Sequence, residues 1–263
     1  SRRKLGIWKR ITVGHRGGEQ GMDSLWPEYD MEKRAINLLQ RFSSTTPYYV
    51  AFGGGKDSIV TLHLVKKAGV PYEAVYNVTG LDPPELVRFI KQYYPDVRRR
   101  LPDITMWKLA EKNGFLPTRY IRYCCKFLKE RTSPKDKILV TGIRAEESVA
   151  RRSRKQVEVN RITKNLHIKP IFGWASDELW DYIRTEKIPY CELYDQGWNR
   201  LGCIGCPMAS KYIRRRDFAR WPQYERLWRK ACEDVVRVRK KRGLSCYGGI
   251  DTGEGYFTWW MGK

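Results

Sequence analysis

Two periodicities of apolar residues alternate along the chain and predict an α/β domain. Short apolar runs over residues 48–52, 72–78 and 138–141 have the length and composition of buried strands. Between and around them, apolar residues recur every three or four positions, as in amphipathic helices. The helices expected in this half of the chain cover residues 31–42, 59–68, 84–94, 103–112 and 118–130. Strands that alternate with helices pair in parallel and are joined by right-handed crossovers.

The pattern becomes helical toward the end of the chain. A short strand is expected over residues 168–172 and a helix over 176–186. Residues 211–242 keep a three-four apolar spacing opposite a basic face, and Pro222 divides this stretch into two helices. The tail from Cys246 to Lys263 is rich in glycine and aromatic residues, and we expect it to dock on the domain.

Three glycines interrupt the first apolar run where a helix follows. The segment is Gly53-Gly54-Gly55-Lys56-Asp57-Ser58. A strand, a glycine turn and a helix N-terminus gather backbone N–H groups that bind an anion, and a lysine adds positive charge. The spacing matches neither a Walker loop nor a dinucleotide-binding fingerprint. The segment predicts a phosphate site, and a glycine-rich connection with an exposed lysine is the alternative.

The charge balance indicates an anionic partner. Lys and Arg number 51 and Asp and Glu 29, which gives a net charge of 51 − 29 = +22. This excess indicates DNA or RNA, or else a basic surface that receives an anionic small substrate. No apolar run approaches the length of a membrane span, and the N-terminus lacks a signal-peptide pattern. We therefore expect a cytoplasmic protein without a membrane partner.

The cysteines indicate a metal site. An odd number of them, seven, argues against a disulfide scaffold. Cys124 and Cys125 are adjacent, and Cys203 and Cys206 form a C-x-x-C pair. Four thiolates suit zinc or a [4Fe–4S] cluster, with four metal-free buried thiols as the remaining alternative. Adjacent cysteines fit one tetrahedral ion poorly, whereas the separate irons of a cube can each take one sulfur, so the geometry favours the cluster.

An ordered series of motifs between about residues 45 and 210 carries a family resemblance. The series contains, in order, the glycine loop, Thr79-Gly80, Cys124-Cys125, Gly142 to Ser148, the arginines that follow, Lys169-Pro170-Ile171 with Trp174, and Leu193 to Gly197 before the C-x-x-C pair. Together they resemble the phosphoadenosine phosphosulfate (PAPS) reductase family, in its cluster-bearing, adenylyl-sulfate-reductase-like branch. This family belongs to the adenine nucleotide alpha hydrolases.

The resemblance implies an open, mostly parallel twisted sheet with helices on both faces, plus a helical C-terminal region. It also implies an adenine nucleotide, either ATP, with Mg²⁺ as its accompanying cation, or PAPS or adenylyl sulfate. The implied ligands are Gly53, Gly54, Gly55, Lys56, Asp57 and Ser58 for the phosphate chain, Thr79 and Gly80 for the nucleoside, Arg144, Arg151 and Arg152 for the sulfate or outer phosphates, and Cys124, Cys125, Cys203 and Cys206 for the [4Fe–4S] cluster. Gly53 departs from the family, which usually has serine there.

We expect three parts in the chain. A basic N-terminal arm covers residues 1–30, the nucleotide-binding α/β domain with the cluster site covers 31–210, and a basic helical extension with an aromatic tail covers 211–263.

The chemistry has three candidate forms. Reductases of this family end in Glu-Cys-Gly-[Ile/Leu]-His, whose cysteine attacks the sulfate sulfur, but Cys246 has neither neighbour. The chain also resembles ATP pyrophosphatases that transfer sulfur to nucleic acid, including DNA phosphorothioation sulfurtransferases and transfer-RNA thiolation enzymes. We favour such transfer, with a thiol or sulfur donor protein as partner and Cys246 as the candidate catalytic thiol. Reduction of PAPS or adenylyl sulfate to sulfite, and a non-catalytic nucleotide- or nucleic-acid-binding role, are the alternatives.

Overall fold

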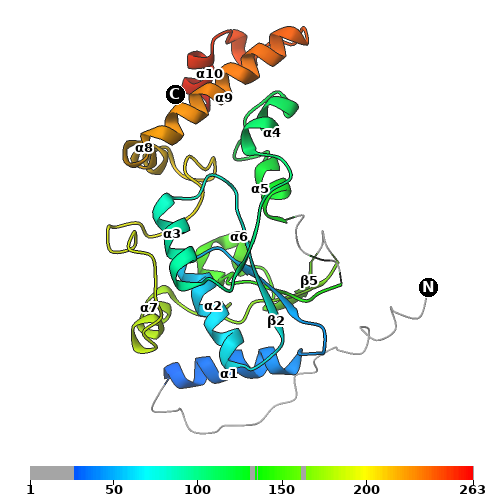
Figure 1. The fold of residues 1–263 in the computed structure, drawn as a ribbon, viewed down its shortest axis with the longest axis vertical. Helices are drawn as coiled ribbons and strands as arrows, with labels where there is room; N and C mark the ends of the chain where they lie inside the picture. Colours follow the sequence, from blue (N-terminus) through cyan, green and yellow to red (C-terminus); the bar gives the residue numbers. More distant parts are fainter. Residues whose placement is uncertain (1–26, 131–133, 135, 161–163, 263) are drawn as a thin grey trace, which may run out of the picture.

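A single six-stranded sheet organises the part of the chain that the computed structural model describes, residues 27–130, 134, 136–160 and 164–262 (Figure 1). In sheet order the strands are β3 (Arg98–Arg100), β2 (Tyr72–Asn77), β1 (Tyr48–Phe52), β4 (Leu139–Val140), β6 (Leu166–Ile168) and β5 (Val157–Val159). All neighbours pair in parallel except β5 and β6, which are antiparallel. This confirms the mostly parallel sheet.

The order of the strands reverses beside β1. From β1 the chain continues outward through β2 to β3, whereas β4 and β6 lie on the other side of β1. Ligands of open α/β sheets bind beyond the carboxyl ends of the strands at such a reversal. The segments that follow β1 and β4 are therefore where a site is expected.

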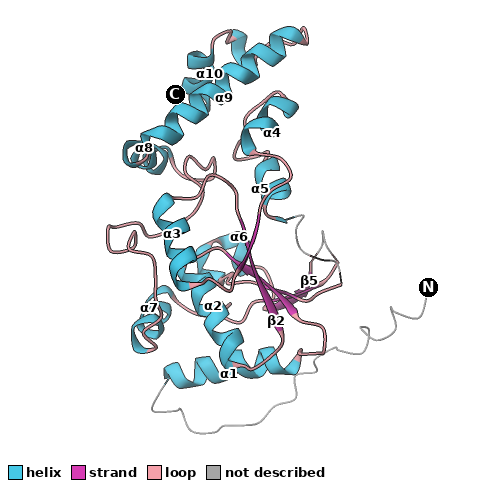
Figure 2. Ribbon diagram, viewed as in Figure 1, coloured by secondary structure: helices cyan, strands magenta, loops and turns pink. Residues whose placement is uncertain are grey.

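Helices surround the sheet and form a second, helical layer above its edge (Figure 2). They are α1 (Pro27–Arg41), α2 (Lys56–Lys67), α3 (Pro84–Tyr93), α4 (Met106–Asn113), α5 (Tyr123–Leu128), α6 (Val149–Arg152), α7 (Ser176–Thr185), α8 (Lys211–Arg220), α9 (Pro222–Lys241) and α10 (Gly253–Trp260), with 3-10 turns η3 (Ala145–Glu147) and η4 (Tyr247–Gly249). Helices α1 and α7 pack on α2, while α4, α8 and α10 pack on α9. Within the described residues, no helix is both long and apolar enough to span a bilayer.

Proline positions explain two helix starts. Pro84 and Pro222 each occupy a first helical turn, where the missing N–H has no partner to lose. Pro222 also separates α8 from α9, which confirms the division expected inside residues 211–242. Thr105 caps α4, since its hydroxyl oxygen accepts a hydrogen bond from the Lys108 N–H at 3.3 Å.

Some elements differ from the sequence expectation. The strand expected over 168–172 occupies 166–168 instead, because Pro170 cannot donate to a strand ladder and the chain turns there. The helix expected over 118–130 is reduced to α5, after a turn in which Thr118 N–H donates to the Ile121 carbonyl at 3.1 Å. Strands β3 and β5 and helix α10 were not predicted.

The C-terminal extension packs against the middle of the chain. Trp228 of α9 stacks on Trp260 of α10 with ring centroids 4.6 Å apart, and Trp107 of α4 meets Trp228 edge-on. The tail is thus docked, as expected for its aromatic residues. The boundary at residue 211 stays a prediction, and most of the basic arm, residues 1–26, lies outside the described residues.

The buried His167 makes the fold sensitive to acid. Its Nε2 lies 2.8 Å from the Thr141 hydroxyl, and burial lowers its pKa to about 4 from the 6.5 of an exposed histidine. Between pH 6.5 and pH 4 the unfolded chain therefore binds a proton that the folded chain does not, so stability falls as the pH falls. We expect this histidine to cost about 3 kcal/mol of unfolding free energy near pH 4.

Urea denaturation of wild type and His167→Gln, at pH 7 and pH 4.5, measures this contribution. Other groups also titrate, so the informative quantity is the difference between the two proteins. The wild type should lose more stability than the variant on acidification, and equal losses would contradict the assignment.

Candidate functional site

The glycine loop joins β1 to α2 at the carboxyl edge of the sheet. Gly54 has φ +69°, and a Cβ there would lie 2.7 Å from the Ile90 side chain, so both conformation and space require glycine. The Ser58 hydroxyl accepts from the Gly53 N–H at 3.3 Å and donates to the Gly55 carbonyl at 2.8 Å. The loop is therefore held in shape from within, and α2 begins at Lys56, directly after the loop.

The segment after β4 packs directly on this loop. A Cβ on Gly142 would lie 2.5 Å from the backbone oxygen of Asp57, in the first turn of α2. The two segments at the reversal of strand order are thus in contact through a glycine. This close approach determines where α2 starts relative to β4.

Arg144 connects the glycine loop to α7. It is only 2% exposed, and its Nε donates to Asp57 Oδ1 at 2.6 Å. Its terminal nitrogens donate to the Trp174 carbonyl at 3.1 Å and the Ser176 hydroxyl at 3.0 Å. Arg144 also pairs with Glu146 at 2.7 Å. The guanidinium is thus engaged by protein acceptors, and its predicted contact with outer phosphates stays a prediction.

The other two predicted arginines lie on α6, beyond η3. Arg151 forms an ion pair with Glu147, and Arg152 is exposed. Helix α6 begins where the Ser148 hydroxyl accepts from the Arg151 N–H at 3.2 Å. Their role toward sulfate or phosphate also stays a prediction.

A pocket of about 450 Å³ opens beside Lys56. Its volume lies within the range of small-molecule sites, about 300–1,000 Å³. Trp180 and Tyr194 line it and meet edge-to-face at 5.0 Å. The Tyr194 hydroxyl accepts a hydrogen bond from the Lys56 backbone N–H at 2.8 Å. A phosphate that binds this N–H must take the place of the hydroxyl.

These aromatic residues were not singled out from the sequence. Tyr194 belongs to the segment Leu193 to Gly197, which counted toward the family resemblance. No spacing within it indicated that the hydroxyl would reach the start of α2, because the contact spans 138 residues of chain.

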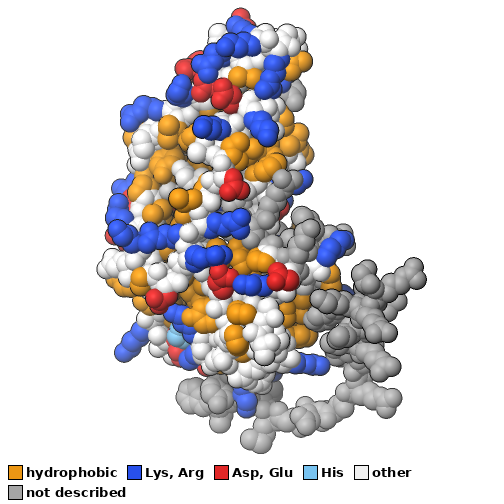
Figure 3. Space-filling model, turned by 45° about the vertical axis from the view of Figure 1, so that its right-hand side comes forward, with side chains coloured by type: hydrophobic (Ala, Val, Ile, Leu, Met, Phe, Trp, Pro, Cys, Tyr) orange, Lys and Arg blue, Asp and Glu red, His pale blue; other side chains and the backbone are white. Residues whose placement is uncertain are grey.

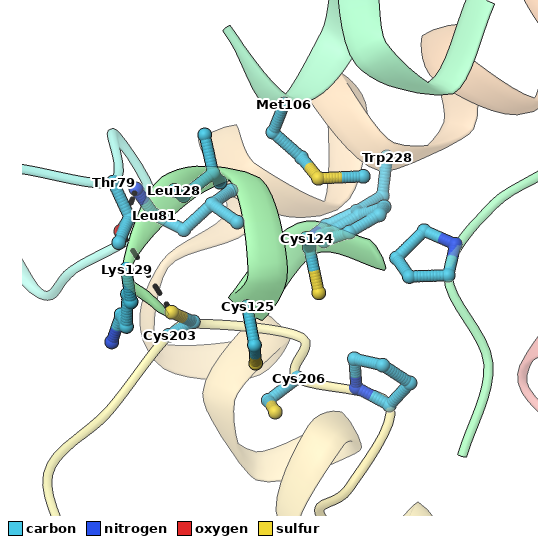
Figure 4. Close-up of a pocket in the computed structure, with 12 residues that line it drawn as sticks. Thr79, Leu81, Met106, Cys124, Cys125, Leu128, Lys129, Cys203, Cys206 and Trp228 are labelled. Atoms are coloured by element: carbon cyan, nitrogen blue, oxygen red, sulfur yellow. Dashed lines mark hydrogen bonds between the residues drawn. The ribbon is translucent and has the colours of Figure 1, made fainter. Parts of the chain in front are cut away.

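The four predicted ligand cysteines line a second pocket (Figure 4). Cys124 and Cys125 come from α5, and Cys203 and Cys206 come from the loop before α8. The Ile204 N–H donates to the Leu81 carbonyl at 2.7 Å, which attaches this loop to the segment after β2. Two segments 78 residues apart thus meet around one cavity, at the same edge of the sheet as the glycine loop.

The stacked tryptophans hold both cysteine segments. The Trp228 Nε1–H donates to the carbonyl of Ile204, between Cys203 and Cys206, at 3.2 Å. The Trp260 Nε1–H donates to the Pro117 carbonyl at 2.8 Å, in the segment before α5. A Cβ on Gly205 would lie 2.5 Å from Trp228 Nε1, so glycine is required for this contact.

Thr79 lies in the cysteine pocket. Its hydroxyl donates to Asp82 at 2.9 Å and lies 3.7 Å from Cys203 Sγ, and the residue is 3% exposed. Gly80 follows with φ +74° and turns the chain out of β2. Their predicted place beside a nucleoside stays a prediction, and the observed neighbour of Thr79 is a thiol.

The electrostatics of this pocket favour a thiolate at one cysteine, Cys125. The Cys124 thiol donates a hydrogen bond to Cys125, and this bond raises the pKa of Cys124. The same bond lowers the pKa of Cys125 to about 6, and the positive charges of Lys129 and Arg122 lower it further. Burial raises the pKa of Cys203. The charge of Cys203 is in turn the main factor that raises the pKa of Lys129.

Zinc and a [4Fe–4S] cluster place different demands on the spacing of the four cysteine sulfurs. Among the described residues, no three His, Cys, Asp or Glu side chains converge as a single metal ion requires. A tetrahedral zinc site needs its sulfurs about 3.8 Å apart, from Zn–S bonds of about 2.3 Å. A cube holds each sulfur on its own iron and so accepts a wider ring. The four thiols line one mainly apolar pocket, and their assignment as cluster ligands stays a prediction.

Cys246 lies apart from both pockets. It is 8% exposed, lines neither pocket, and follows the end of α9, where Arg239 Nε donates to the Ser245 carbonyl at 3.0 Å. The structure therefore does not bring it to the glycine loop or to the other thiols.

The contact of Gly142 with α2 yields a prediction. Gly142→Ala should destabilise the protein by about 2 kcal/mol, because its Cβ would overlap backbone that cannot move aside. Gly53→Ala is the matched control: nothing lies within 4 Å of its Cβ, so stability should change by less than about 0.5 kcal/mol. Urea denaturation compares them, and equal stabilities would show that the close approach is absent.

Comparison with known proteins shows which family the chain resembles. Residues 47–209 match the family model described as phosphoadenosine phosphosulfate reductase domain. An uncharacterized protein of Methanocaldococcus jannaschii is 34% identical over 77% of this chain and 46% of its own length. An adenosine 5'-phosphosulfate reductase of Staphylococcus haemolyticus is 25% identical over 82% of this chain and 93% of its own.

The fold is also found among solved structures. A phosphoadenylyl-sulfate reductase of Candida auris aligns with a TM-score of 0.50 at 18% identity, over 71% of this chain and 98% of that one. The chain spans about half the length of the two archaeal relatives that it matches. With more than half of its residues matching the family model, the chain belongs to the phosphoadenosine phosphosulfate reductase domain family.

Proposed function

We propose that this protein is an ATP-dependent sulfurtransferase that acts on a nucleic acid and carries a [4Fe–4S] cluster. The observation that supports this most is the pairing of two features at one edge of the sheet. A glycine loop that leads into the N-terminus of α2 lies there beside a pocket of about 450 Å³, and four thiols line a second pocket. The net charge of +22 supports a polyanionic acceptor.

The proposed reaction is balanced without an external oxidant or reductant. A carbonyl oxygen of the acceptor base attacks the α-phosphorus of ATP, and pyrophosphate leaves. A donor of sulfur at the hydrosulfide level then attacks the activated carbon. The carbon–oxygen bond breaks, AMP leaves with the oxygen, and a carbon–sulfur double bond remains after loss of the proton.

The glycine loop would bind the phosphate chain during this sequence. The backbone N–H groups at the start of α2 and the Lys56 ammonium supply positive charge, and Mg²⁺ would neutralise the rest. Arg144 would hold Asp57, and through it the first turn of α2, in place. Cys124, Cys125, Cys203 and Cys206 would hold the cluster; because four cysteines would ligate all four of its irons, the sulfur would come from a separate donor.

Reduction of adenylyl sulfate or PAPS to sulfite is the second candidate. The Staphylococcus haemolyticus relative, covered over 93% of its length, is named as such a reductase. This chemistry needs an accessible thiolate to attack sulfur. The burial of Cys246, at 8% exposure, and its position outside both pockets favour sulfur transfer over reduction.

An assay under anaerobic conditions distinguishes the two reactions. The protein is given ATP, an unmodified RNA or DNA acceptor and sulfide, and AMP and pyrophosphate are quantified. In parallel it is given adenylyl sulfate or PAPS with a dithiol, and sulfite is quantified. We expect AMP, pyrophosphate and thiolated acceptor in the first assay and no sulfite in the second. Sulfite release that depends on Cys246 would establish the reductase instead.

Lys56→Ala links the assay to the glycine loop. The variant should weaken ATP binding about 10- to 100-fold, since one charge-assisted contact contributes about 1.5–3 kcal/mol. Because Arg144 still holds Asp57, the fold should persist. Lys66→Ala, at the exposed far end of the same helix, is the control and should bind ATP as wild type does. Equal ATP affinities of the two variants would remove the glycine loop from the site.

A further inference from the structure

Two chain segments leave the cysteine pocket side by side and present an unusual surface. Pro117 and Pro207 both line the pocket. Residues 117–122 lead from there into α5, and residues 207–210 lead into α8. The Arg119 guanidinium donates to the Met208 carbonyl at 3.2 Å, which ties the two segments together. We call the surface formed by residues 117–129 and 207–216 the collar.

All charged residues of the collar are basic. Each of its two segments contains four Lys or Arg, and neither contains Asp or Glu. Two of these cations serve the fold: Arg214 donates to the Trp260 and Met261 carbonyls, and Arg216 lies over the Trp198 ring. Of the remaining six, Lys129 lines the cysteine pocket, and the other five are exposed: Arg119, Arg122, Lys126, Lys211 and Arg215. Figure 3 shows Lys and Arg side chains interspersed with hydrophobic ones on the upper part of the molecule.

Large apolar side chains are exposed in the same place. Tyr120 is 93% exposed and Tyr212 is 73% exposed, and Ile121, Phe127 and Met208 are also exposed. These five belong to thirteen exposed large hydrophobic side chains in the described residues, so a short part of the chain holds more than a third of them. The backbone fixes the position of Tyr120, because this residue lies at the tip of a turn that is closed by a hydrogen bond from the Thr118 N–H to the Ile121 carbonyl.

Charge and aromatic exposure together select one class of partner. Cations alone would suit any polyanion, including duplex DNA or an acidic protein. Exposed aromatic rings between cations are what unpaired bases stack on, whereas a duplex offers no free base faces along its length. Collar residues such as Pro117, Leu128 and Pro207 also line the pocket of the four thiols, where the proposed sulfur transfer would take place.

We propose that the collar binds a single-stranded stretch of nucleic acid, with bases stacked on Tyr120 and Tyr212 and phosphates on the exposed cations. The proposed binding of a single strand follows from the exposure and charge of the collar. It rests on the proposed function only for the identity of the reaction. The strand would run across the mouth of the cysteine pocket. An unpaired base would thereby be presented to the reacting groups without opening a duplex.

Fluorescence anisotropy with labelled 20-mers of single-stranded RNA, single-stranded DNA and duplex DNA tests the proposal. Single strands should bind more tightly than duplex. Tyr120→Ala and Tyr212→Ala should each weaken single-strand binding about fivefold to a hundredfold, the effect of losing one stacked base. Tyr93→Ala is the matched control, since Tyr93 is 51% exposed on α3, outside the collar, and it should bind as wild type does. The RNA and DNA arms identify the preferred strand.

The salt dependence of single-strand affinity distinguishes a contribution of the collar cations from a contribution of the overall net charge. Lys126→Gln with Arg215→Gln should reduce the slope of log affinity against log salt by about 1.4, whereas Lys33→Gln with Lys91→Gln should leave it unchanged. The proposal fails if the tyrosine variants bind like wild type, if duplex binds as well as single strands, or if polyglutamate competes equally. The anisotropy measurement needs neither ATP nor turnover. A negative sulfur-transfer assay therefore would not contradict single-strand binding by the collar, and absence of that binding would not contradict sulfur transfer.

Discussion

The thiol pocket depends on the stacking of Trp228 on Trp260. One indole N–H holds the loop between Cys203 and Cys206, and the other holds the segment that precedes α5. Stacked rings buried at 1% and 6% exposure form a rigid unit, so the two cysteine segments keep a fixed separation. This gives the C-terminal extension a structural purpose, because helices far along the chain position thiols that belong to the α/β region.

The nucleotide side of the molecule depends on a different kind of contact. There, the backbone of the segment after β4 packs closely on the backbone of the first turn of α2, and Gly142 leaves room for this approach. Arg144 holds the same turn through its hydrogen bond to Asp57. Both pockets therefore form at the carboxyl edge of the sheet, one held by glycines and a buried arginine, the other by tryptophans. The loop from Tyr194 to Cys203 connects them along the chain.

Much of this arrangement was predictable because it is local. The apolar run of β1, the glycine turn and the helix that follows are adjacent in sequence, and Pro222 separates two helices by its own covalent geometry. The pairing of Cys124 and Cys125 with Cys203 and Cys206 was also predictable, from an ordered set of motifs. The roles of Trp228, Trp260 and Tyr194 were not, since each acts through a contact more than 20 residues away. The burial of Arg144 against Asp57 likewise depends on the meeting of two loops, which no local pattern encodes.

In the proposed centre, an adenine nucleotide and a metal cluster bind at the same edge of the sheet. An anaerobic crystal structure with a non-hydrolysable ATP analogue, recorded at the iron absorption edge, tests this most directly. The account predicts iron anomalous density enclosed by the four sulfurs of Cys124, Cys125, Cys203 and Cys206, and a triphosphate on residues 53–58. A single zinc ion among the thiols, or a nucleotide bound away from the glycine loop, would contradict it.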